Sequence, residues 1–128
     1  MMDHYIERVT WDQVNEYLNK IVESVDKDKC TGVYGIPRGG LVLAAWLSHK
    51  LYKPLLSAPC NNCVIIDDIC DSGESLMHYA KQSSTPLAEK DKGYFITTMY
   101  YRENSLAIKP DYYYALKDNK WIVFPWEE

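Results

Sequence analysis

The segment Val64–Leu76 reads Val-Ile-Ile-Asp-Asp-Ile-Cys-Asp-Ser-Gly-Glu-Ser-Leu, and its order of residues decides the fold. Its first three residues are branched and apolar on successive positions, which predicts a buried strand that is covered on both faces. Two adjacent carboxylates, Asp67 and Asp68, stand at the carboxyl end of this strand, and a short polar turn then leads into an amphipathic segment. This pattern indicates a parallel sheet with helices on each side.

The turn that follows the acidic pair is suited to an anion. Free N–H groups in a loop of small residues, together with the dipole of the following helix, favour a phosphate. The carboxylates of Asp67, Asp68 and Asp71 suit sugar hydroxyls or a hard cation. A site with both features is predicted to bind a phosphorylated sugar. The alternative interpretation is that Asp71, Ser72 and Ser75 only cap the next helix, as such residues can in any fold.

A second strand, glycine loop and helix precede this segment. The sequence predicts a short strand over Gly32–Ile36, a loop Pro37-Arg38-Gly39-Gly40, and a helix over about Leu41–Leu51. The glycines let backbone amides approach a ligand closely, and the Arg38 guanidinium can form paired hydrogen bonds to phosphate oxygens. The alternative is a tight turn with a solvated arginine. Together the two units predict two anion-binding turns at neighbouring strand ends.

Length and composition narrow the class of protein. A chain of 128 residues has room for a single domain, residues 1–128, with one core. Its 47% apolar and 25% charged residues are ordinary for a soluble globular protein. The net charge of −4 provides no basic surface for nucleic acid or an anionic membrane. No stretch approaches the ~20 apolar residues that span a bilayer, and the N-terminus lacks a signal-peptide pattern, so we expect a cytoplasmic protein.

The four cysteines are Cys30, Cys60, Cys63 and Cys70. Cys60 and Cys63 form one CxxC pair, but no second pair has the spacing of a structural zinc site. We therefore expect reduced thiols, with a zinc site or a redox pair as the alternatives.

Other patterns complete the fold prediction. Thr10 and Gln13 form a predicted capping box at the start of a helix. Its apolar face has helical spacing and contains Val14, Tyr17, Leu18, Ile21, Val22 and Val25. Further along, the sequence predicts a short strand over Leu55–Ala58, a helix over Ser75–Gln82 and a strand over Tyr94–Met99.

Near the C-terminus, Tyr112–Leu116 and Trp121–Phe124 flank Lys117–Lys120, which predicts a hairpin-type connection. Strands and helices that alternate in this way predict an α/β fold with a doubly wound, mostly parallel sheet and a small C-terminal β appendage.

The acidic strand end resembles a known family motif. An apolar strand, an acidic pair, two residues and then Asp-Ser-Gly-x-Ser resemble the phosphoribosyl-pyrophosphate (PRPP) motif of type I phosphoribosyltransferases. The Arg-Gly-Gly loop resembles the pyrophosphate loop of that family, in which the peptide bond before the arginine is often cis. Tyr5-Ile6 and Val9–Asp12 at the start, with Trp121-Ile122 and Pro125-Trp126 at the end, resemble its bacterial xanthine-guanine branch. The resemblance covers most of the chain.

The resemblance implies a purine phosphoribosyltransferase. Such an enzyme transfers the phosphoribosyl group of PRPP to guanine, xanthine or hypoxanthine, uses Mg²⁺, and releases a nucleoside monophosphate and pyrophosphate. It also implies a homo-oligomer. Two alternatives stay open: a regulatory protein that binds PRPP or a nucleotide without turnover, and a protein that has kept only the fold.

The resemblance also implies residue roles. Asp67 and Asp68 would bind the ribose hydroxyls, with Asp68 near the Mg²⁺, and Asp71 would lie near N7 of the purine as general base or charge partner. The remaining contacts are to the pyrophosphate from Arg38, Gly39 and Gly40, to the 5′-phosphate from Ser72, Gly73, Glu74 and Ser75, and to the base from Arg102, Trp121 and Ile122. Without the resemblance, Trp121 could equally be a core tryptophan.

The sequence departs from the family pattern at three places. Only a few residues separate Ala58 from the central strand, where the family has a longer mobile loop that closes over the reacting centre. Arg102 stands where the family has a lysine that contacts the exocyclic oxygen of the purine, and the two side chains differ in geometry. Glu74 places a carboxylate in the phosphate loop, where it would be repulsive unless it turned to solvent.

Overall fold

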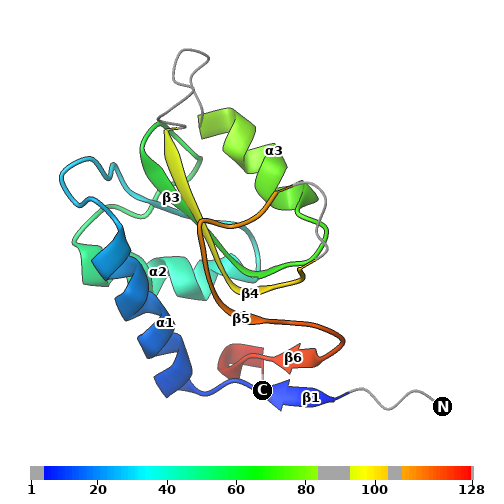
Figure 1. The fold of residues 1–128 in the computed structure, drawn as a ribbon. Helices are drawn as coiled ribbons and strands as arrows, with labels where there is room; N and C mark the ends of the chain where they lie inside the picture. Colours follow the sequence, from blue (N-terminus) through cyan, green and yellow to red (C-terminus); the bar gives the residue numbers. More distant parts are fainter. Residues whose placement is uncertain (1–4, 84–92, 104–107, 128) are drawn as a thin grey trace.

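The computed structural model describes residues 5–83, 93–103 and 108–127. Its centre is a parallel sheet of four strands in the order β2-β3-β4-β5 (Figure 1). The strands are β2 (Val33–Gly35), β3 (Cys63–Cys70), β4 (Tyr94–Tyr101) and β5 (Tyr112–Leu116). Every pair within this sheet is parallel, so all four carboxyl ends lie at the same edge.

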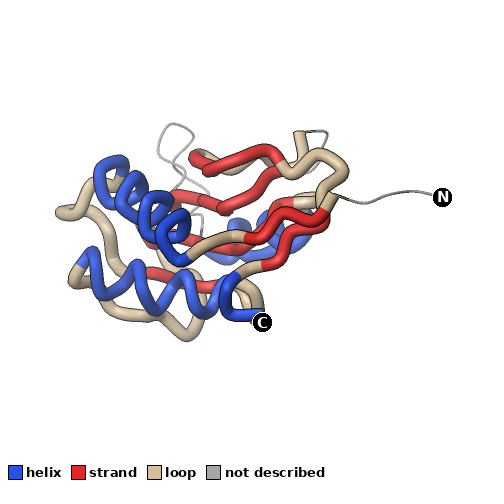
Figure 2. Tube along the Cα trace, turned by 90° about the horizontal axis from the view of Figure 1, so that it is seen from below, coloured by secondary structure: helices blue, strands red, loops and turns tan. Residues whose placement is uncertain are grey.

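Three helices cover the two faces of this sheet. Helices α1 (Trp11–Ser24) and α2 (Gly40–Leu51) contact each other and pack on one face. Helix α3 (Glu74–Ser83) packs against β3 and β4 on the other face, as Figure 1 shows. Figure 2 shows the strands flanked by helices in the perpendicular view. The predicted doubly wound α/β fold is confirmed.

The central strand is buried on both faces, as its apolar sequence predicts. Val64 and Ile66 belong to the core cluster beneath α1 and α2, whereas Ile65 belongs to the cluster beneath α3. All three side chains are at most 1% exposed. Successive residues of this strand point alternately into the two hydrophobic clusters. Because both faces are buried, the strand needs apolar residues at successive positions.

The start of α1 is also as predicted. The Gln13 amide N–H donates to Thr10 Oγ1 at 3.1 Å, and the Thr10 N–H donates to Gln13 Oε1 at 2.9 Å, which completes the capping box. Tyr17, on the buried face of α1, hydrogen-bonds through its hydroxyl to Thr97 Oγ1 of β4 at 2.8 Å. This bond ties α1 to the central sheet.

A second, two-stranded sheet joins both ends of the described chain. Strand β1 (Ile6–Arg8) pairs in parallel with β6 (Trp121–Val123), and a 3₁₀ turn η1 (Pro125–Glu127) follows. The predicted hairpin-type connection between β5 and β6 is therefore wrong: β5 pairs with β4, and β6 with β1. The reason is burial, because Ile122 and Phe124 enter the core beneath α1 and α2.

Two other strand predictions need correction. Leu55–Ala58 contributes a single parallel bridge, Leu55 to Val33, instead of a strand. Prolines at positions 54 and 59, which have no N–H to donate, leave this edge segment too short to continue the pairing. By contrast, β3 is longer than predicted and runs through the acidic pair to Cys70, because β4 pairs with it along that length. Among the residues described, no helix is long and apolar enough to cross a bilayer.

Candidate active site

The acidic pair lies within β3 near the carboxyl edge of the sheet. Both carboxylates fold back on their own strand: the Asp68 N–H donates to Asp67 Oδ1 at 2.8 Å, and the Ile69 N–H donates to Asp68 Oδ1 at 2.7 Å. Neighbouring main-chain N–H groups therefore hold the two side chains in place. Each carboxylate also has a second oxygen, which can accept a hydrogen bond from a ligand.

Asp67 is electrostatically unusual. Burial raises the pKa of its carboxyl well above the ordinary value, and the adjacent negative charge of Asp68 raises it further. The hydrogen bond from the Asp68 N–H works in the opposite direction but is the smaller effect. A buried carboxylate beside a like charge is costly in the free protein, so this pair favours a proton, a cation or a hydroxyl donor as its partner.

The Arg-Gly-Gly loop packs directly onto this pair. A Cβ atom at Gly39 would lie 2.1 Å from Asp68 Oδ2, and one at Gly40 would lie 2.4 Å from the carbonyl oxygen of Ile66. Both positions therefore need glycine because of close approach to β3. The Pro37–Arg38 peptide bond is cis, as the family resemblance implied.

A cavity of about 580 Å³ opens where this loop meets β3. It is lined by Arg38, Gly39, Asp68, Trp126 and Glu127. One guanidinium and two carboxylates around a cavity of this size suit a ligand that carries both anionic groups and a metal ion. The predicted residues Arg38, Gly39 and Asp68 are thus brought together.

The other two lining residues were not predicted as site residues. Trp126 is held by stacking on Phe124, with ring centroids 4.8 Å apart, and by Trp11 at 6.0 Å. Glu127 Oε1 accepts a hydrogen bond from the Phe124 N–H at 2.8 Å, which fixes the 3₁₀ turn. The C-terminal Pro-Trp-Glu sequence does not indicate which loop this turn contacts, so the position of Trp126 and Glu127 in the cavity could not be predicted from it.

A smaller cavity of about 110 Å³ lies at the turn after β3. Its lining consists of the turn and the residues that flank it: Asp67, Ile69, Cys70, Asp71, Ser72, Gly73, Ser75 and Leu76. Gly73 has φ 83°, a left-handed conformation that favours glycine. A cavity of this volume at the N-terminus of α3 suits a small anion such as a phosphate group.

Glu74, the acidic residue of this turn, does not line the small cavity. Its side chain is exposed at the start of α3, and its N–H donates to Ser72 Oγ at 3.3 Å. The carboxylate therefore faces solvent, which is the orientation that a phosphate site in this turn requires.

Arg102 lies beside the predicted charge partner of the base. Arg102 Nη1 is 3.4 Å from Asp71 Oδ1, and both side chains are about half exposed, at 54% and 55%. The Arg102 N–H also donates to the carbonyl of Cys70 at 2.9 Å. Two residues predicted to lie near the base, which follow β3 and β4, thus meet at the carboxyl edge of the sheet.

The other two predicted base-binding residues lie in the small sheet. Trp121 is 65% exposed, so the interpretation as a core tryptophan is wrong, whereas Ile122 is buried. Neither residue lines the two cavities at the carboxyl edge. Their contact with a base stays a prediction.

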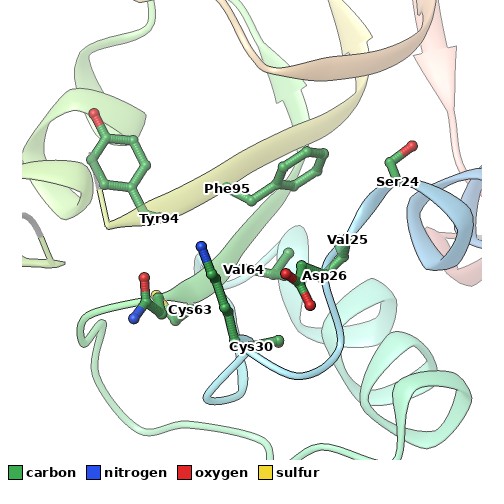
Figure 3. Close-up of a pocket in the computed structure, with 10 residues that line it drawn as sticks. Ser24, Val25, Asp26, Cys30, Cys63, Val64, Tyr94 and Phe95 are labelled. Atoms are coloured by element: carbon green, nitrogen blue, oxygen red, sulfur yellow. The ribbon is translucent and has the colours of Figure 1, made fainter. Parts of the chain in front are cut away.

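The opposite edge of the sheet contains the Cys30 and Cys63 thiols. They line a cavity of about 120 Å³. Figure 3 shows its lining, with Cys30 near Cys63 and Tyr94, the first residues of β3 and β4. All four cysteines are free. Within the described residues, no three His, Cys, Asp or Glu side chains are grouped so as to hold a metal ion.

Comparisons with known proteins agree with this geometry. No family model matches the sequence. The xanthine-guanine phosphoribosyltransferase of Chromohalobacter salexigens is 22% identical over 93% of this chain and 82% of its own. The crystal structure of a purine phosphoribosyltransferase from Pyrococcus horikoshii superposes with a TM-score of 0.76 and 28% identity, over 96% of this chain and 95% of that one.

A third protein shares the fold at lower identity. A hypothetical protein from Neisseria gonorrhoeae, solved with bound ppGpp, has a TM-score of 0.71 and 15% identity over 100% of this chain and 92% of its own. In sequence over most of its length and in its fold, the chain thus resembles the purine phosphoribosyltransferases of type I, as its motifs predicted.

Proposed function

We propose that this protein transfers the phosphoribosyl group of PRPP to a purine base, with guanine, xanthine and hypoxanthine as the candidate acceptors. The observation that carries the proposal is the contact between the Arg38-Gly39 loop and the Asp68 carboxylate, beside a second cavity of phosphate size. Similarity to purine phosphoribosyltransferases along nearly the whole chain supports it.

The groups divide among the parts of PRPP according to their chemistry. Arg38 and the Gly39 backbone bind the pyrophosphate in the larger cavity, and Asp67 and Asp68 accept hydrogen bonds from the ribose hydroxyls. The turn Ser72–Ser75 holds the 5′-phosphate with backbone and hydroxyl donors. Asp71 stabilises the positive charge that develops on the purine as it bonds to C1.

The residues of the larger cavity fit Mg²⁺ as the cofactor. Asp68 and Glu127 offer hard oxygen ligands, and Mg²⁺ commonly binds through one or two carboxylates together with substrate phosphates and waters. When bound, such an ion stabilises the charge that develops on the departing pyrophosphate. Asp68 and Glu127 would hold it, and Arg38 would bind the same pyrophosphate from the loop side.

The test is direct. Protein incubated with Mg-PRPP and each of guanine, xanthine and hypoxanthine is expected to form the matching nucleoside monophosphate, detected by chromatography. Arg38→Ala is the informative variant, because it removes the pyrophosphate contact. Lys20→Ala, on the exposed side of α1, is the matched control. Failure to form any nucleotide at high protein concentration would disprove transfer.

A second candidate function is binding of a nucleotide without turnover. The short connection before β3 favours it, because a loop that closes over the reacting centre contributes to the rate by excluding water. A protein of the same fold was solved with bound ppGpp. Calorimetric titration with GMP and with ppGpp tests this candidate: micromolar binding without turnover supports it, and steady-state nucleotide formation excludes it.

A further inference from the structure

Cys60 and Cys63 stand at the two ends of a tight turn at the amino edge of the sheet. Asn61 and Asn62 form the turn, and Asn62 has φ 63°, a left-handed conformation. A positive φ at the third position is typical of a type II turn, in which the Cα atoms of the first and fourth residues lie within about 7 Å. A disulfide joins residues whose Cα atoms are about 4.4–6.8 Å apart. The turn therefore brings the two cysteines to about the separation that a disulfide spans.

The Cys63 sulfur lies against the main chain of Cys60, whose N–H donates a hydrogen bond to it. Because the N and Cβ atoms of a residue are bonded to the same Cα, rotation of Cys60 about χ1 brings its Sγ toward the Cys63 sulfur. In the reduced protein, Cys60 Sγ lies 3.3 Å from Thr31 Oγ1 instead. A thiol is a weak hydrogen-bonding group, so this exposed contact opposes the rotation only slightly.

The turn is fixed by bonds that a disulfide would leave intact. The Thr31 N–H donates to the Asn62 carbonyl at 3.0 Å, and Thr31 Oγ1 donates to the Asn61 carbonyl at 2.8 Å. The Asn62 N–H donates to the Gly93 carbonyl. These bonds join the turn to the segments that lead into β2 and β4. The main chain between the two cysteines is thus held in one conformation before any oxidation.

The two thiols differ in accessibility. Cys60 is exposed, whereas Cys63 is only 1% exposed. Burial raises the pKa of the Cys63 thiol to about 11. Since the thiolate is the nucleophile in thiol–disulfide exchange, a buried thiol of this kind does not react first. Cys60 is therefore the thiol that meets a disulfide from solution, and Cys63 is the internal thiol that completes the exchange.

The other two cysteines are not placed to compete. Cys30 and Cys63 line the same cavity (Figure 3), but they belong to the core clusters on opposite faces of the sheet. The Cys30 thiol donates to the Gly32 carbonyl at 3.6 Å. Cys70 ends β3, about 23 Å from Cys63 at the rise of an extended strand. The geometry therefore favours one pairing, Cys60 with Cys63.

We propose that Cys60 and Cys63 form a reversible dithiol–disulfide site that reduces low-molecular-weight disulfides. The Cys60 thiolate attacks one sulfur of such a disulfide, its S–S bond breaks, and the departing sulfur takes the electron pair and a proton. The Cys63 thiolate then attacks the Cys60 sulfur of the mixed disulfide and releases the second small thiol. Two protein thiols are oxidised and one disulfide is reduced, so electrons and protons balance. The inference does not rest on the proposed function, because it uses none of the groups at the carboxyl edge.

The experiment incubates the reduced full chain in buffers of increasing ratio of oxidised to reduced glutathione. After equilibration the samples are quenched with acid, alkylated in denaturant and analysed by mass spectrometry with peptide mapping. The expected product has lost two hydrogens, has Cys60 linked to Cys63, and has Cys30 and Cys70 alkylated. Excess dithiothreitol should reverse the change. A link to Cys30, a lasting glutathione adduct on Cys60 with Cys63 alkylated, or no disulfide at any ratio would overturn the proposal.

Variants test the order of attack. Cys63→Ala is expected to trap one glutathione on Cys60. Cys60→Ala should slow the first reaction with oxidised glutathione by at least about tenfold, because the remaining buried thiol with its raised pKa contains little thiolate. Cys30→Ala is the matched control, since it also removes a buried thiol of this edge, and it should form the Cys60–Cys63 link as the unmodified protein does.

A Cys60→Ala protein that forms an adduct on Cys63 as fast as the unmodified protein reacts would show that the assigned order is wrong and overturn the proposal. Circular dichroism establishes that each variant is folded. If Cys63→Ala does not fold, the peptide maps of the unmodified protein and of Cys30→Ala still decide which cysteines pair.

Discussion

Two partly buried carboxylates at different places in the molecule have opposite electrostatic surroundings. Asp67, in the central sheet, has the negative Asp68 as its neighbour, and burial together with that charge raises its pKa. At Glu7, in the small sheet, burial alone would raise the pKa. Hydrogen bonds from Tyr100 and Lys120, with the positive charge of Lys120, more than offset that effect and lower it.

The difference distinguishes the candidate binding site from a structural contact. Glu7 Oε2 accepts a hydrogen bond from the Tyr100 hydroxyl, and Glu7 Oε1 is 2.9 Å from Lys120 Nζ. These bonds connect β1, β4 and the turn before β6, so they join the small sheet to the central one. The charge of Glu7 is satisfied within the protein, whereas the like charges of Asp67 and Asp68 favour a cation or a hydroxyl donor as their partner.

The largest expected effect is on catalysis, through Asp68. Asp68→Asn keeps the shape of the side chain but removes a charge beside Arg38 and Glu127 in the larger cavity. Because stabilising groups in such sites each contribute a factor of about 10²–10³, we expect nucleotide formation to fall by that factor. Steady-state kinetics with Mg-PRPP and saturating base measures it.

Glu7→Gln is the matched control for Asp68→Asn. It also replaces a partly buried carboxylate by an amide, but in the small sheet, so the rate per folded molecule should stay at the unmodified value when measured well below the melting temperature. An equal loss of activity in both variants would show that the two regions do not differ in function.

The sequence predicted which residues of the candidate site lie together where its signals are local. The apolar run before Asp67, the glycines after Arg38 and the capping box at Thr10 are each set by residues within a few positions of one another. Parallel strands then bring the ends of β2 and β3 together, so Gly39 meets Asp68 although 29 positions separate them in the sequence. The fold class and the core of the site follow from these patterns.

The remaining features depend on contacts between distant segments that carry no local signal. Glu7 contacts Tyr100 and Lys120, which are 93 and 113 positions away. The pairing of β6 with β1, and the position of Glu127 in the same cavity as Arg38 and Gly39, also depend on distant segments. A Lys-Asp-Asn-Lys turn between two apolar segments predicts a hairpin unless burial of the second segment against another strand is known.

Asp67→Asn is expected to stabilise the free protein by on the order of 2 kcal/mol near pH 7, because each unit of pKa shift corresponds to about 1.4 kcal/mol and the site is partly solvated. The raised pKa means that the folded state holds the Asp67 proton more tightly than the unfolded state does. The gain is therefore absent below the ordinary aspartate pKa and grows as the pH rises through the interval up to the raised value. Thermal unfolding between pH 3.5 and pH 8 measures it; a gain independent of pH would contradict the electrostatic explanation.

Glu7→Gln is expected to have the opposite effect and to destabilise the protein by about 1–2 kcal/mol at neutral pH, since hydrogen bonds to a charged group contribute that much. The lowered pKa of Glu7 means that its contribution is present above the ordinary glutamate pKa and is lost as the pH falls through the lowered value. Denaturant unfolding measures the free energy of unfolding of the variant and of the unmodified protein. The difference between the two proteins should therefore be large at pH 7 and small at pH 3. A larger loss at pH 3 would reverse the assigned sign.

The smallest effect is expected for Lys120→Met, about 0.5 kcal/mol, because the pair with Glu7 is about one-third exposed and the Tyr100 hydrogen bond remains. The methylene stem of Lys120 is kept in methionine, so the measured loss reports the charge. Salt screens a partly exposed pair, so the difference in the free energy of unfolding between the variant and the unmodified protein should shrink as NaCl rises from 0.05 M to 1 M.

The double variant with Glu7→Gln tests whether Lys120 acts through Glu7. In that background, replacing Lys120 should lower the free energy of unfolding almost no further, because the charge that it neutralises is already gone. A full additive loss in the double variant would mean that Lys120 stabilises the turn before β6 by packing, and that Glu7 depends on Tyr100 alone.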